Sequence, residues 1–117
     1  MMIETSAGIP MDSIVLKNYF KALVDAIFKI LPLWENGEET LGVYMQSLQA
    51  ELLGCKELIL AINEDPLFLS LVSILQYLID NPDCEISFVR REVFGAISIC
   101  NKLKSRYYVP TPEEVSV

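Results

Sequence analysis

Apolar residues recur at intervals of three and four along most of the chain, with polar residues between them. This spacing is that of one face of an α-helix, whereas a strand alternates with a period of two. The pattern therefore predicts an all-α fold, a compact antiparallel bundle of four long helices and one short helix with short loops. The predicted helices cover residues 12–31, 38–53, 55–62, 66–80 and 85–107.

Capping and turn residues set the expected boundaries of these helices. Pro32 is expected to stop the first helix, and Asn36-Gly37 indicates a turn. Gly54 is a natural residue to follow the end of the second helix. Asp65-Pro66 has the pattern of an N-cap followed by proline at the first helical position, and Asn81-Pro82 closes the helix that begins there.

The helix predicted at residues 66–80 is apolar around almost its whole circumference. Its polar residues form one thin stripe, made of Ser70, Ser73, Gln76 and Asp80. We expect the first three to face solvent or to bond back to helix carbonyls, with a polar seam at a self-association interface as the alternative. Such a helix is typical of the buried centre of a domain, with a dimer interface as the alternative. In the other long helices we expect these core residues: Leu16, Tyr19, Phe20, Leu23, Ile27, Ile30, Leu31, Leu41, Tyr44, Met45, Leu48, Leu52, Ile86, Val89, Val93, Ala96, Cys100, Leu103 and Tyr107.

Length and composition indicate one domain. The chain has 117 residues, and its apolar fraction of 52% excludes a disordered protein. We predict a helical domain over residues 12–108, a flexible leader at 1–11 and a disordered tail at 109–117. The longest apolar stretch, residues 66–79, is shorter than the roughly 20 residues that span a membrane, so we expect no membrane segment.

The residue types that carry most enzyme chemistry are scarce. The chain has no His, which excludes Ser-His and Cys-His nucleophilic pairs and His-ligated metals. Its three cysteines match no metal-binding spacing, and we expect reduced thiols in a cytoplasmic protein, with Cys100 in the core and Cys84 the most exposed. Neither a phosphate-binding glycine loop nor a calcium-loop pattern is present. We therefore predict no enzyme activity, no cofactor and no metal site.

The net charge of −7 is unevenly distributed. Residues 35–85 contain ten acidic residues and one Lys, whereas residues 86–108 contain five basic residues and one Glu. One interpretation is that the last helix packs beside acidic elements of the same chain, which partly neutralises both. The other is a partner surface, since an acidic region steers a protein toward basic partner surfaces.

The last helix has basic and apolar residues outside its core stripe. Such a face is covered within the chain, covered by a second copy, or reserved for a foreign partner. The six candidate partner-binding residues are Phe88, Arg91, Phe94, Ile99, Lys102 and Arg106.

These observations favour a small, acidic, non-enzymatic protein that acts by binding another, unidentified protein, as an inhibitor, an adaptor or a chaperone. We also expect self-association, most simply as a homodimer. The alternative is a regulator that contacts nucleic acid through the basic face of the last helix. That alternative is disfavoured, because a net charge of −7 repels a polyanion.

Overall fold

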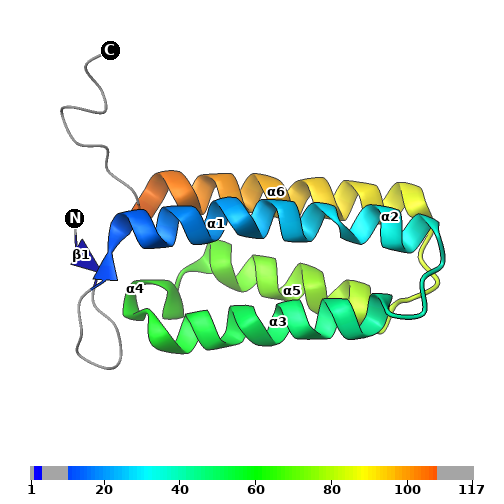
Figure 1. Cartoon of the computed structure of the whole chain (residues 1–117), viewed down its shortest axis with the longest axis horizontal. Coiled ribbons are helices and arrows are strands. Elements are labelled where there is room, and N and C mark those ends of the chain that lie inside the picture. Colours follow the sequence, from blue (N-terminus) through cyan, green and yellow to red (C-terminus); the bar gives the residue numbers. More distant parts are fainter. Residues whose placement is uncertain (1, 4–10, 108–117) are drawn as a thin grey trace, which may run out of the picture.

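The computed structural model describes residues 2–3 and 11–107 of the chain. It confirms the all-helical class. Four long helices each follow the long axis of the molecule, and two short helices lie between them (Figure 1). The helices are α1 (Ser13–Phe28), α2 (Ile30–Glu35), α3 (Leu41–Leu58), α4 (Leu60–Asn63), α5 (Pro66–Asp80) and α6 (Ile86–Tyr107).

Two very short strands precede the helices. β1 (Met2–Ile3) pairs in antiparallel fashion with β2 (Met11–Asp12). These residues belong largely to the predicted leader, of which residues 1 and 4–10 lie outside the described residues. The predicted tail at 109–117 lies outside them as well.

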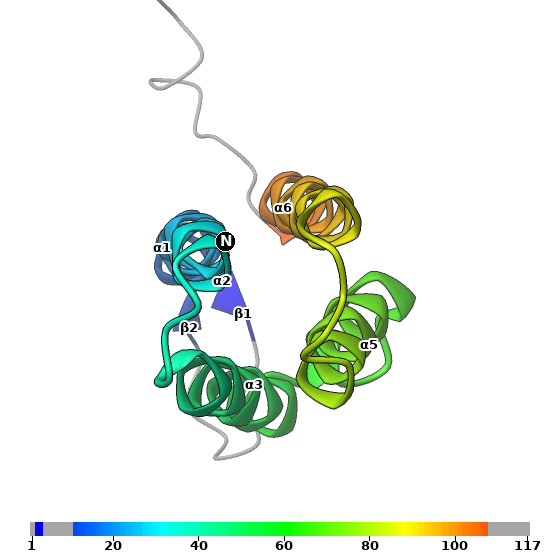
Figure 2. The same cartoon turned by 90° about the vertical axis from the view of Figure 1, so that its right-hand side faces the viewer.

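The long helices occupy four corners when the molecule is seen end-on (Figure 2). One corner is taken by α1 and α2, and the other three by α6, α5 and α3. The most extensive contact is between α1 and α6, while α5 contacts both α3 and α6. The molecule therefore has two layers, one made of α1, α2 and α6 and the other of α3 and α5.

The predicted stripes form the core between these layers. Tyr19, Leu41, Tyr44 and Ile86 are only partly buried, and the side chain of Tyr107 is not among those described. All the other predicted stripe residues are buried: Leu16, Phe20, Leu23, Ile27, Ile30, Leu31, Met45, Leu48, Leu52, Val89, Val93, Ala96, Cys100 and Leu103.

The expectation that the 66–80 helix is the enclosed centre is wrong. α5 stands at a corner of the bundle, with Leu69 and Tyr77 41% and 48% exposed (Figure 2). Four of its residues are buried, on one side of the helix. The thin polar stripe is exposed as expected, and the Ser73 hydroxyl donates back to the Leu69 carbonyl oxygen over 3.0 Å.

Two predicted helix boundaries are also wrong. Pro32 does not end the first helix, because it occupies the first turn of α2, where backbone N–H groups have no partner within the helix. The interruption falls at Lys29 instead. Gly54 does not end the second helix, since α3 continues to Leu58 and thereby packs Cys55 against the core. The predicted short helix is correspondingly reduced to α4.

The boundaries of α5 agree with the prediction. The carboxylate of Asp65 accepts a hydrogen bond from the Leu67 backbone N–H over 2.9 Å, and Pro66 takes the first helical position. None of the helices within residues 2–3 and 11–107 is both long and apolar enough to cross a membrane.

Candidate protein-interaction surface

The six residues predicted on the last helix do not form one surface. Phe88 lies on the side of α6 that faces α5. Phe88 is partly buried, with its ring centroid 5.5 Å from that of Tyr77. Ile99 is partly buried against the core. These two side chains are thus partly covered within the chain.

Arg91 is exposed and lies beside Phe88. Its guanidinium carbon is 5.2 Å from the centroid of the Phe88 ring. This distance allows a cation–π contact, in which the guanidinium group lies over the ring and stays at the surface.

Arg106 has a structural partner. Its Nη1 donates to both carboxylate oxygens of Asp65, over 2.9 and 2.8 Å. The Asp65 side chain is only 3% exposed, and its carboxylate also caps α5. Arg106 therefore joins the end of α6 to the start of α5, so it is not a freely available surface charge.

Phe94 is exposed and has a neighbour that the sequence did not indicate. Its ring meets that of Phe28 edge to face, with centroids 5.9 Å apart and an interplanar angle of 71°. Both residues are 48% exposed. The signal for Phe28 was its position outside the apolar stripe of its helix, but only the packing of α1 on α6 brings the two rings together.

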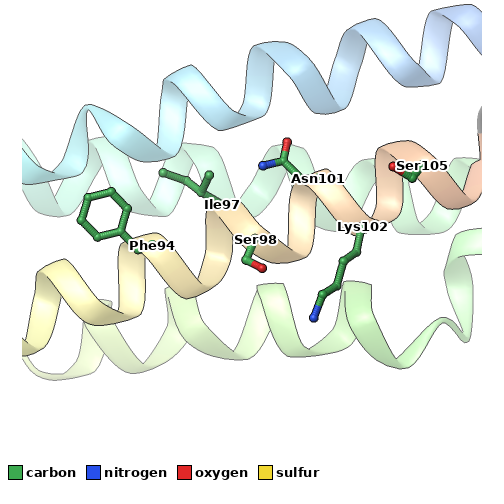
Figure 3. A pocket seen from close by; sticks show the side chains of 6 residues that line it. All are labelled: Phe94, Ile97, Ser98, Asn101, Lys102 and Ser105. Carbon is green, nitrogen blue, oxygen red and sulfur yellow. The ribbon is translucent and has the colours of Figure 1, made fainter.

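Lys102 borders a shallow hollow that begins at Phe94 and follows the outer side of α6 (Figure 3). Ile97 and Asn101 lie on its side toward α1, and Ser98 and Lys102 lie on the side toward α5. All the lining residues belong to one helix, so the hollow is an open surface depression.

The fold separates the charges into two halves. Residues 13–35 and 86–107, which form the layer of α1, α2 and α6, contain eight basic and three acidic residues. Residues 36–85, which include α3 and α5, contain nine acidic residues and one Lys. Because α1 packs on α6, the lysines of α1 and the bases of α6 share one half of the molecule (Figure 2).

The three cysteines are free thiols, and Cys100 is buried as predicted. Burial raises the pKa of Cys55 to about 11 and that of Cys100 to about 12. Both therefore stay protonated near neutral pH, the form that is a poor nucleophile. Among the described residues, no three or more Cys, Asp or Glu side chains are grouped so that they could hold a metal ion.

Comparison of the chain with protein-family models, curated proteins and solved structures gave no significant match. The structure itself is that of a small helical protein with an exposed aromatic pair on its basic half.

Proposed function

We propose that this chain is a non-enzymatic protein that binds another protein through the outer face of α1 and α6, as an inhibitor, an adaptor or a chaperone. The observation that carries the proposal is the Phe28–Phe94 pair, two rings in contact that the fold leaves half exposed. In this proposal the long helices form an antiparallel bundle that acts as a rigid scaffold. We place the role in the cytoplasm, because the cysteines are free thiols.

The chemistry of the partner follows from what surrounds the rings. Covering them removes apolar area from water, which contributes roughly 25 cal/mol per Å². Arg91 lies about one helical turn before Phe94, and Lys102 lies about 12 Å beyond it along α6. An acidic partner surface with an apolar centre satisfies both features. Opposite charges would also speed the encounter.

Self-association is part of the same proposal. Two copies that met through the same α1–α6 face would bring their cations together, which opposes a symmetric dimer. A second copy instead fits with its acidic half, residues 36–85, against the basic half of the first. Such contact is heterologous, since each copy uses two different surfaces.

The test is affinity capture from a native-source lysate treated with nuclease. The wild-type chain is compared with a Phe28→Ser/Phe94→Ser double variant and with Val43→Ser, a control at a 67% exposed position on α3. We expect one protein to be captured by the wild type and the control but lost with the double variant. Circular dichroism verifies that the variants fold. Equal capture by all three chains, or no capture, counts against the proposal.

Nucleic acid is the second candidate for the same face, because eight of the nine basic residues lie in one half of the molecule. The test is fluorescence anisotropy with labelled single-stranded and duplex oligonucleotides. Binding should weaken steeply with salt and disappear in an Arg91→Glu/Lys102→Glu variant. Arg106 is left unchanged because it stabilises the fold through Asp65. Binding that persists in the double variant would place the nucleic acid elsewhere.

A further inference from the structure

A cavity of about 330 Å³ opens at one end of the bundle, between the start of α3, the end of α5 and the connections that follow α2 and α5. This end is opposite to the one where β1, β2 and the end of α6 lie (Figure 1). Its apolar walls include Trp34, Leu41, Met45 and Ile79, and its remaining lining includes Glu38 and Glu39.

The wall formed by Trp34 is held in place. Its indole N–H donates to the Cys84 carbonyl oxygen over 3.2 Å, which ties α2 to the connection before α6. The chain then turns at Gly37, whose φ of +62° is the left-handed conformation that favours glycine. The Glu38 N–H donates to the Leu33 carbonyl oxygen over 3.1 Å, so the two glutamates follow directly from a fixed turn.

The two charged residues that line this cavity, Glu38 and Glu39, are both acidic. Residues 36–40 and 80–85, which both lie at this end of the bundle, contain five carboxylates and no Lys or Arg. Nearby, Glu35 already has a partner in Arg90, at 2.9 Å. An anionic ligand would be repelled here, whereas a cation would be attracted.

We propose that this cavity binds an organic cation, an alkylammonium or alkylguanidinium group, supplied either by a free amine or by a Lys or Arg side chain of a protein. The alkyl stem packs against Leu41, Met45 and Ile79, and the charged head lies between the Trp34 ring and the carboxylates of Glu38 and Glu39. The site is separate from the α1–α6 face, and it does not depend on the function proposed for that face.

The test uses the fluorescence of Trp34, the single Trp of the chain. The full chain is titrated at pH 7 and low salt with n-hexylammonium, and in parallel with n-hexanol and hexanoate, which have the same stem. We expect saturable binding of hexylammonium, about tenfold weaker binding of hexanol, and none of hexanoate. Binding should also weaken as salt is added. Equal binding of hexanol and hexylammonium, or no saturable binding of hexylammonium, overturns the proposal.

A variant pair tests the named residues. Glu38→Gln together with Glu39→Gln should weaken hexylammonium binding about tenfold, because both head-group charges are lost while the stem contacts remain. Glu57→Gln, at an exposed position on α3, is the matched control and should leave the binding unchanged. Unchanged binding in the double variant overturns the assignment.

A final arm separates the two sources of the cation. The blocked tripeptides Gly-Lys-Gly and Gly-Arg-Gly are titrated in the same way. Binding as tight as that of hexylammonium, and lost in the double variant, assigns the site to a basic side chain of a protein. Clearly weaker binding of both peptides assigns it to a free amine. Either result supports an organic-cation site, provided that hexylammonium itself binds.

Discussion

The carboxylate of Asp65 contacts two elements at once. It caps α5 through the Leu67 N–H and accepts both hydrogen bonds from Arg106 at the end of α6. Being 3% exposed, it depends on such partners, since a buried charge without them is costly. Arg90, in contrast, makes a pair with Glu35 in which both side chains are about half exposed. The two arginines therefore differ in what they contribute to stability.

Replacing Arg106 by Ala should lower the free energy of unfolding by about 1–3 kcal/mol, because a buried carboxylate loses charged hydrogen bonds. The loss stays within this range since the arginine itself is half exposed. Arg90→Ala is the matched control and should cost less than about 1 kcal/mol. Urea unfolding followed by circular dichroism measures both. Equal losses would contradict the structural role of Arg106.

Burial of the Cys100 thiol predicts a loss of stability in alkali. Its pKa rises from 9.0 to about 12 in the folded chain, so this contribution to stability is complete below pH 9 and is lost as the pH rises toward 12. The loss should be at most about 1.4 kcal/mol per pH unit. Cys100→Ala removes the part of this pH dependence that comes from Cys100. The part that comes from other buried groups remains, for example from Tyr19, whose pKa is also raised by burial. Urea unfolding from pH 8 to 11 measures the free energy of unfolding of the wild type and of Cys100→Ala. Identical slopes of this free energy against pH would refute the prediction.

At the scale of elements, α3 departs most from what local residues suggest. It passes through Gly54, which is exposed, and a Cβ added there would meet nothing within 4 Å. The helix continues because the residues that follow contribute to the core, among them Cys55 and Ile59. The free energy gained by burying these residues thus exceeds the roughly 1 kcal/mol that a glycine costs inside a helix.

Gly54→Ala should therefore raise the free energy of unfolding by about 0.5–1 kcal/mol, since it adds helix propensity without a steric clash. Gly37→Ala should have the opposite effect, with a loss of about 1 kcal/mol, because an L-residue is strained at a φ of +62°. Thermal or urea unfolding of the two variants compares them directly. A destabilising Gly54→Ala would mean that α3 is interrupted at this point in solution.

At the scale of the whole molecule, the decisive feature is the separation of charge between two layers. The chain carries −7 overall, yet the layer of α1, α2 and α6 contains five more basic than acidic residues. Residues 36–85 contain eight more acidic than basic residues. Electrostatic attraction therefore favours acidic partners at the layer of α1, α2 and α6 and basic partners at the layer of α3 and α5.

If copies associate through these two halves, light scattering should give an average mass above 13.2 kDa at high micromolar concentration in low salt. The mass should fall toward that of the monomer at about 0.5 M salt, because the Debye length shrinks well below 10 Å. Arg91→Glu/Lys102→Glu should also lower it. A constant mass of 13.2 kDa would remove self-association from the proposed function, and a mass that rises with salt would indicate contact between like faces.

The candidate surface is harder to predict from the sequence than the fold. A helical wheel of the last helix separates Phe94 from the core stripe, but it groups Phe94 with Phe88 and Ile99, which are partly buried within the chain. It also counts Arg106 as a surface charge. A wheel describes one helix in isolation, so it cannot include the neighbours on either side of that helix.

The sequence by itself determined the helical class, the residues of most core stripes and both ends of α5. These depend on periodicity and capping, which act over a few residues. Only the tertiary structure decided which groups meet across the chain: Phe28 with Phe94, Asp65 with Arg106, and Trp34 with Cys84. The physical reason is that side-chain packing joins segments far apart in sequence. It therefore determines which side chains stay exposed, where charge gathers and where a cavity remains.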